Sequence, residues 1–159
     1  MAQKRRLTLA DEIKQTRPFA SAAQEATLAL LRTSNMIRRR IAKLVEREQI
    51  TVQQYNVLRI LRGAHAPLPA LEIQDRLVEE TPGVSRLIDR LVAKGLVRRD
   101  RSATDRRLLE CSITRGGLRI LERLDADVNR ADAGVLSALT ASEIAMLNEL
   151  FSRVRESNR

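Results

Sequence analysis

The sequence predicts a mainly α-helical protein that carries one small β-hairpin. Two observations lead to this fold class. Residues 19–62, 118–133 and 135–159 contain neither proline nor glycine, and stretches without these helix breakers favour long helices. Apolar residues recur every three or four positions over most of the chain, but the period changes to two after Gly95, which is typical of strands. The length of 159 residues fits one domain with its own core.

Composition narrows the classes of function. The net charge of +9 and the pI of about 11.0 predict a polyanionic partner, with nucleic acid ahead of a membrane surface. The aromatic residues are only Phe19, Tyr55 and Phe151, which are too few for a platform that stacks single-stranded bases. No apolar run approaches the length of a membrane span, so we expect no membrane partner.

The reactive side chains are scarce as well. Cys111 is the one cysteine and His65 the one histidine, so an internal disulfide and a multi-cysteine metal site are excluded. With no Gly-rich phosphate loop and no metal cluster, we expect no enzyme, no cofactor and no metal. A single cysteine is compatible with the reducing cytoplasm, which is the location we expect.

The N-terminal part divides into an arm and a long helix. Residues 1–17 are polar and basic, and we expect a mobile arm there. An apolar stripe from Phe19 predicts a helix over about 19–47, in a dimerisation region that we place at 18–48. Such a helix would be about 43 Å long. A helix of that length is expected to pack against something beyond its own subunit.

Two shorter helices are predicted next. Thr51 and Gln54 fit a capping box, which starts a helix that ends at Gly63. A second helix is expected over about 69–77. Tyr55 is expected in the core, with a place in the lining of a ligand pocket as the alternative.

A third helix is predicted to start at Thr81. Thr81 is expected to be its N-cap and Pro82 its first residue, where a missing N–H costs nothing. Lys94 and Gly95 end it, with a cation in the last turn and glycine just after it.

A β-hairpin follows this helix. Residues 96–99 and 108–113 are the expected strands, and the residues between them form a charged tip. Leu109, Cys111 and Ile113 share one face of the second strand, so Cys111 is expected to be a buried structural thiol.

The C-terminal region, residues 116–159, is predicted to hold two helices. Thr114 caps the first, which is expected to begin near Gly116, and Thr140 with Glu143 forms a capping box for the second. Apolar residues between 121 and 135 recur at spacings of three and four, which indicates a heptad-like seam.

The order of helices and hairpin within residues 49–115 predicts a winged helix-turn-helix. In such units the second helix of the turn enters the major groove of DNA. Residues 81–107 hold eight cations and three anions, a net charge of +5, as a DNA surface needs. The expected DNA-contacting residues are Thr81, Pro82, Gly83, Ser85, Arg86, Arg90, Arg101, Arg106 and Arg107, with Asp105 orienting a wing arginine.

Several of these charged residues have an alternative interpretation. Arg86 and Arg90 could lie on a solvated helix face with Asp89 pairing locally, and Asp105 could simply pair with a neighbouring arginine. Arg38, Arg39 and Arg40, with Lys43 nearby, are expected on a solvated face. Phosphate contact or a salt bridge between subunits is the alternative for this run. His65 is expected on the surface.

Three segments in this order carry a resemblance. They are residues 51–58, residues 84–91 followed by Lys94-Gly95-Leu96-Val97, and Asp105-Arg106-Arg107 of the wing. Together they resemble the MarR family of bacterial transcriptional regulators, over roughly residues 20–157. The sequence departs from the family pattern in two places. Glu80-Thr81-Pro82-Gly83 stands where the recognition helix often begins with serine and a basic residue, and the first helix of the turn begins at Pro69 instead of a serine or threonine cap.

The resemblance implies a homodimer with interleaved terminal helices and two winged units on the halves of a pseudo-palindromic operator. It also implies a repressor that releases double-stranded DNA when a small aromatic or phenolic effector binds. Arg107 is the wing residue that the resemblance favours for insertion into DNA. The alternatives are a transcriptional activator and an effector-independent architectural DNA-binding protein. The expected dimerisation residues are Ala23, Ala26, Leu30, Leu121, Leu124, Val128, Leu147, Leu150, Phe151 and Val154.

Overall fold

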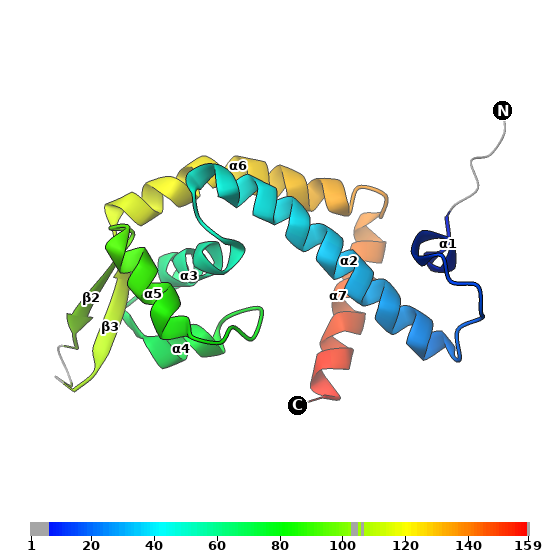
Figure 1. The fold of residues 1–159 in the computed structure, drawn as a ribbon, viewed down its shortest axis with the longest axis horizontal. Coiled ribbons are helices and arrows are strands. Elements are labelled where there is room, and N and C mark those ends of the chain that lie inside the picture. The colour runs from blue at the N-terminus through cyan, green and yellow to red at the C-terminus, as the bar shows by residue number, and fades with distance from the viewer. Residues whose placement is uncertain (1–6, 103–104, 106, 159) are drawn as a thin grey trace. The chain divides into compact units, whose positions relative to one another are not determined.

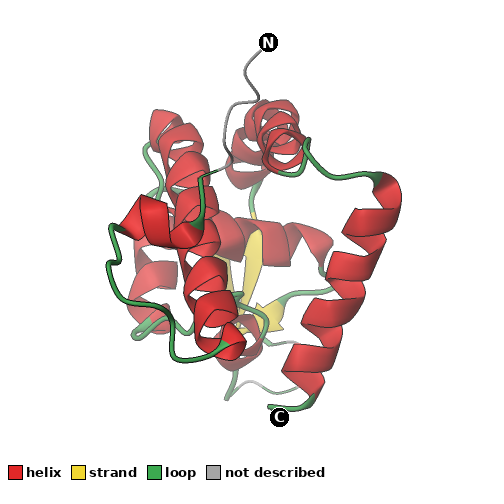
Figure 2. Ribbon diagram, turned by 90° about the vertical axis from the view of Figure 1, so that its right-hand side faces the viewer, coloured by secondary structure: helices red, strands yellow, loops and turns green. Residues whose placement is uncertain are grey.

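The computed structural model describes residues 7–102, 105 and 107–158. It confirms the predicted fold class, because helices dominate and the strands form one small sheet (Figure 2). The chain divides into two compact units, Met1–Arg39 and Arg40–Arg159. Within the described residues, no helix is both long and apolar enough to cross a membrane.

The first unit contains helix α1 (Leu9–Ile13) and most of helix α2 (Ala22–Val45). The expectation of an arm over residues 1–17 needs a correction here. Thr8 and Asp11 form a capping box that starts α1, and a capping box stabilises a helical turn. Residues 1–6 lie outside the described residues. No described side chain of this unit is buried, which leaves its apolar residues without a core of their own.

The second unit contains the core and the remaining elements. In chain order they are the 3₁₀ helix η1 (Glu46–Glu48), α3 (Val52–Gly63), β1 (Leu68–Pro69), α4 (Ala70–Asp75), α5 (Val84–Ala93), β2 (Val97–Arg101), β3 (Leu109–Ile113), α6 (Arg115–Val135) and α7 (Ala141–Glu156). Figure 1 shows α3, α4 and α5 gathered beside the strands. This is the order of helices and hairpin that the sequence predicts for the winged unit.

The sheet is antiparallel and has the strand order β1-β3-β2. Cys111 lies in its central strand, opposite Leu68 of β1 and Arg99 of β2, and is fully buried. The predicted hairpin is therefore confirmed. The two-residue strand β1 was not predicted, because a pair of residues that ends in proline has no strand period to detect.

Threonine is the N-cap of α1, described above, and also of α3, α6 and α7. Thr51, Thr114 and Thr140 accept a hydrogen bond from the backbone N–H three residues on, as the sequence predicts. Thr81 is not a cap, so that prediction is wrong. Helix α5 begins at Val84, and its N-cap is Gly83, whose φ of +73° is left-handed. A residue in that conformation cannot continue the helix backward, and the Thr81 hydroxyl instead donates to the Glu79 carbonyl at 3.1 Å.

The core is built from apolar side chains of α3, α4, α5 and α6. Its largest fully buried members are Leu58, Ile73, Ile88, Leu91 and Leu121. Leu121, Leu124 and Val128, which we expected at a dimer interface, belong to this core. The correction has a simple physical reason: the seam on α6 is already covered by other elements of the same chain, α3 in particular.

Candidate nucleic-acid interface

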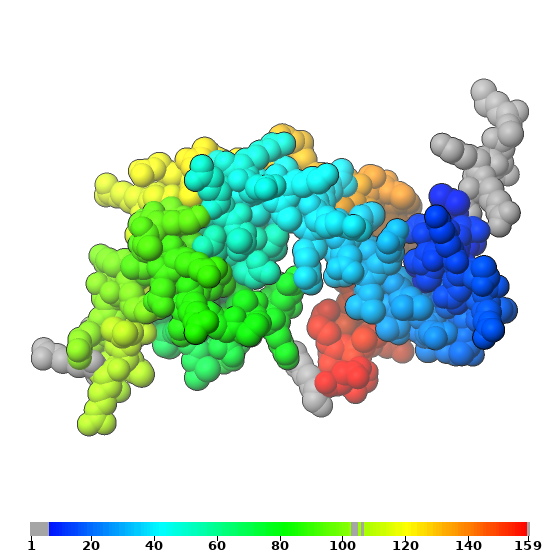
Figure 3. All heavy atoms as spheres, viewed as in Figure 1, coloured from blue at the N-terminus to red at the C-terminus, as the bar shows by residue number. Residues whose placement is uncertain are grey.

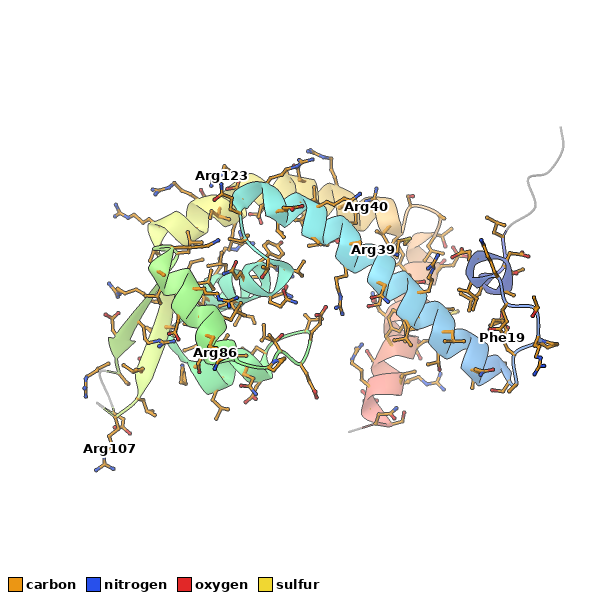
Figure 4. The ribbon with its side chains drawn as sticks, in the orientation of Figure 1. Phe19, Arg39, Arg40, Arg86, Arg107 and Arg123 are labelled. Carbon is orange, nitrogen blue, oxygen red and sulfur yellow. The ribbon has the colours of Figure 1, made fainter. Side chains whose placement is uncertain are left out.

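Helix α5 has one buried face and one exposed polar face. Val84, Ile88 and Leu91 are buried in the core. Arg86 and Arg90 are exposed on the polar face, as Figure 4 shows for Arg86. In the space-filling view the residues of α5, in green, form part of the visible surface of the second unit (Figure 3). A helix held in this way presents its polar side to a partner.

The N-terminus of α5 is suited to an anion. The N-cap residue Gly83 has no side chain that could accept a hydrogen bond from the first amides, and no acidic residue lies in the first turn. The first backbone N–H groups of a helix carry a partial positive charge and have no partner inside the helix. A phosphate oxygen is a suitable acceptor for them.

The exposed face of α5 lines a shallow hollow of about 530 Å³. Thr81, Pro82 and Gly83 border it at the N-terminal end of the helix. Its complete lining is Thr51, Gln53, Thr81, Pro82, Gly83, Arg86, Leu87 and Arg90. The structure thus brings five of the predicted DNA-contacting residues together, and Ser85 lies exposed on the same first turn.

Sequence reasoning missed Thr51 and Gln53 as members of this surface. They come from the start of α3, which packs against α5. Thr51 was recognised only as a helix cap. The one signal that could have suggested a second role is the helix-turn-helix order itself, which places the start of a neighbouring helix beside the recognition helix.

Some arginines of α5 and β2 pair with a carboxylate, and others do not. Arg99 pairs with Asp89 at 2.8 Å, and Arg98 pairs with Asp100. Asp89 therefore pairs across to β2 rather than with the arginines of its own helix. Among the described residues, no carboxylate pairs with Arg86 or Arg90. Their charges are available to an external anion.

The wing is the hairpin of β2 and β3 with the loop that joins them. Hydrogen bonds from backbone amides hold this loop. The Ser102 amide donates to the Leu108 carbonyl at 2.9 Å, and the Arg107 amide donates to Oδ1 of Asp105 at 2.9 Å. This second bond forms a turn of the kind that aspartate favours. Asp105 thus fixes the backbone of Arg107, whose side chain is exposed at the end of the wing (Figure 4).

Arg101 and Arg106 are the other two arginines predicted for the wing. Arg101 is the last residue of β2 and is exposed. Arg106 lies outside the described residues, so the structure gives no position for it.

An acidic surface adjoins the hollow. Asp75, Glu79 and Glu80 line a second depression of about 550 Å³, which shares Thr81 and Pro82 with the first. Thr81 and Pro82 therefore mark a boundary between a cationic surface on α5 and an acidic surface before it. DNA phosphates are attracted to the first and repelled by the second.

Cys111 and Tyr55 are buried in the core, whereas His65 lies on the surface. Burial raises the pKa of the Cys111 thiol, although Arg99 beside it acts in the opposite direction. Burial also raises the pKa of Tyr55, which lies in the core with the guanidinium of Arg59 5.7 Å from its ring centre. His65 is exposed. In the part of the chain that the structure describes, no group of His, Cys, Asp and Glu could hold a metal ion.

Comparison with known proteins gives a consistent result. The model of the MarR family matches residues 48–108. The crystal structure of a MarR transcription factor from Planctomyces limnophilus is 36% identical to this chain, with a TM-score of 0.64 over 85% of this chain and 98% of the other. The chain belongs to the MarR family. It is thus a DNA-binding transcriptional regulator with a winged helix-turn-helix.

Two further relatives of this MarR-family protein are informative. A mutant of MarR from E. coli complexed with operator DNA is 26% identical, with a TM-score of 0.73 over 93% of this chain and 99% of the other. The homoprotocatechuate degradative operon repressor of Escherichia coli is 27% identical over 127 residues, which cover 78% of this chain and 83% of the relative. The first relative is bound to operator DNA, and the second is named as the repressor of an operon.

Proposed function

We propose that this MarR-family protein is a homodimeric repressor that reads a pseudo-palindromic operator and is released by a small-molecule effector. The main support for this mode of DNA binding is that Arg86 and Arg90 lie on the exposed face of α5. Among the described residues, neither has a carboxylate partner. Arginine can hydrogen-bond to guanine with two parallel N–H groups in the major groove. In this mode α5 enters the major groove, and Ser85 at its first turn lies close to the bases or the backbone.

The backbone and the wing supply the remaining contacts. The uncapped amides at the start of α5 would bind a phosphate, and Thr81, Pro82 and Gly83 would lie against the DNA there. Arg107 would enter the minor groove, where the negative potential is strongest in narrow segments. Arg101 and Arg106 would contact phosphates, which position the protein without reading the sequence.

The dimer is supported by apolar side chains that the chain leaves exposed. Helix α7 has no buried residue, and Leu150 and Val154 are 45% and 55% exposed. In the first unit Leu30 is 45% exposed, and Ala23 and Ala26 are exposed as well. A unit of this size without a buried side chain is not stable on its own. We propose that Ala23, Ala26, Leu30, Leu147, Leu150, Phe151 and Val154 are buried by the second copy.

Two symmetric recognition helices define the expected operator. In a dimer of winged units they lie about one DNA turn apart, roughly 34–36 Å. An effector releases the DNA only if it binds the released state more tightly than the DNA-bound state. The name of the Escherichia coli repressor refers to the degradation of homoprotocatechuate. This supports an aromatic or phenolic compound as the effector of the present protein.

Fluorescence anisotropy tests the proposal directly. The purified protein is titrated into a duplex from its own upstream region and into a scrambled duplex, each across a salt series. We expect sequence-selective binding of one dimer per site, with affinity that falls steeply as salt rises. Equal affinity for the two duplexes would support an architectural protein, and no binding at low salt would contradict the DNA-binding mode.

The dimer has its own test. Light scattering after size exclusion should give twice the mass of the chain, and L150E should reduce that mass toward a monomer. E149Q, at an exposed neighbouring position, is the matched control. A monomeric wild-type protein at micromolar concentration would contradict the dimer.

A further inference from the structure

A second cationic hollow lies on the second unit, where the end of α2 faces α6. It has a volume of about 390 Å³. It lies apart from α5 and the wing, since none of its lining residues belongs to these elements. We call it the basic hollow, and its lining is Arg40, Lys43, Leu44, Arg47, Asp127, Arg130 and Ala131.

The cations of the basic hollow are concentrated by helical spacing. Arg40 and Lys43 lie three positions apart near the end of α2, and Arg47 follows four positions later in η1. All three line the same hollow. Arg130 joins them from α6. Like charges at such spacings repel one another, so four cations in one hollow need a counter-charge.

The chain itself supplies only one counter-charge in this lining. Asp127 accepts from Arg47 at 3.3 Å and also pairs with Arg130. Arg40 and Lys43 have no carboxylate partner among the described residues. The Arg40 guanidinium lies over α6 beside Gly134, where an added Cβ would be 3.6 Å away. Four cations and one anion leave the lining with a charge of +3.

This arrangement suits a compact anion with several charges. Guanidinium groups bind carboxylate or phosphate through two parallel N–H groups, whereas an ammonium group acts as a point charge. Leu44 and Ala131 add apolar surface to the lining, and the volume falls within the range of small-molecule sites. We propose that the basic hollow is a binding site for a small, multiply charged oxyanion, a phosphorylated or polycarboxylated metabolite. This site does not depend on the proposed operator or effector.

Isothermal titration calorimetry with the full chain tests the site. Pyrophosphate and citrate are the probes, each in buffer held at constant ionic strength with KCl. We expect saturable binding of one anion per chain in the basic hollow, in addition to any weaker binding at the start of α5. In the double variant R40Q/K43Q the affinity should fall by about tenfold or more, since charge-assisted hydrogen bonds are lost. Both positions are exposed, so the variant should retain its fold.

A matched variant separates this site from the DNA surface. R86Q/R90Q also removes two exposed arginines, and it should keep the saturable binding that R40Q/K43Q weakens. Binding of pyrophosphate alone would identify the natural ligand as a phosphate compound, and binding of citrate alone as a polycarboxylate. The proposal is overturned if neither probe gives saturable heat, if R40Q/K43Q binds as tightly as the wild type, or if R86Q/R90Q loses the binding equally.

Discussion

The carboxylate of Glu48 accepts two hydrogen bonds from the guanidinium of Arg123, at 2.9 Å from Nε and 2.6 Å from Nη2. Glu48 ends η1, just before α3, and Arg123 lies on α6, where Figure 4 labels it. A second forked pair, Arg62 with Asp125, joins the other end of α3 to the same helix. The two pairs together fix α3, and so the frame of the recognition helix, to α6.

The first prediction concerns the pH dependence of stability. The hydrogen bonds from Arg123 lower the pKa of Glu48 below its ordinary value of 4.5. A carboxylate with a lowered pKa in the folded state stabilises the protein above the unfolded-state pKa. This stabilisation is lost as the pH falls through the folded-state pKa. We therefore expect E48Q to unfold at lower urea concentration than the wild type at pH 7, with a smaller difference at pH 3.

The control for this prediction is E46Q. Glu46 belongs to the same 3₁₀ helix and is exposed, and no described cation pairs with it. Its urea midpoint should follow that of the wild type at both pH values. A difference between E48Q and the wild type that does not shrink on acidification would contradict the role of the Arg123 pair.

A second prediction concerns the close approach of α6 to the sheet. A Cβ at Gly117 would lie 2.5 Å from the Leu96 carbonyl oxygen and 2.7 Å from Cγ1 of Ile113. G117A should therefore overpack this contact and reduce the free energy of unfolding by about 1–3 kcal/mol. At Gly63 an added Cβ meets no atom within 4 Å, so G63A should not destabilise. Equal urea midpoints for the two variants would contradict the contact.

A third prediction compares two threonines. Thr51 accepts a hydrogen bond from the Gln54 amide at 3.2 Å, whereas Thr81 caps no helix. T51A should lower the free energy of unfolding by about 1 kcal/mol, the typical cost of losing an N-cap. T81A, which removes the same atoms, should lower it by less. Denaturation by urea measures both variants, and a greater loss in T81A would contradict the assignment of the caps.

The contrast between Thr51 and Thr81 also shows what the sequence could and could not predict. A capping box is defined by two residue types at a fixed spacing, so the start of α3 could be located from the residues alone. A threonine followed by proline fits the start of a helix, but it also fits a turn before a left-handed glycine. The choice depends on φ at Gly83, which is set by how the loop packs and not by the local pattern.

The prediction of buried residues from the sequence has a similar limit. The periodic residues of α6 indicate that one face is covered, but periodicity does not say by which chain. Leu121 is covered by its own chain, whereas Leu150 on α7 is left exposed. Arg86 and Arg90 lie on the exposed face of α5, as the sequence predicts, and their contact with DNA stays a prediction. Gln53 was missed because its place beside α5 arises from tertiary packing.

A fourth prediction concerns base recognition by Arg86. If this side chain reads a base, R86A should weaken binding to the operator by about 1–3 kcal/mol. Its effect on a scrambled duplex should be smaller, because non-specific binding depends on phosphate contacts. Anisotropy titrations at one salt concentration measure both affinities. The control is R119A, which removes an exposed arginine of α6 that does not line the hollow. An equal loss on both duplexes would assign Arg86 to the phosphate backbone.

The last prediction concerns the wing. Asp105 fixes the backbone of Arg107 and leaves its exposed side chain free to reach DNA. R107A should reduce the affinity and flatten the plot of log affinity against log salt by about one unit of slope, because one fewer counterion is released. R119A removes an exposed arginine of α6 and should leave the slope unchanged. Since D105A removes the acceptor for the Arg107 amide, it should weaken binding in the same direction as R107A. A slope in R107A equal to that of the wild type would show that the wing arginine makes no ionic contact with DNA.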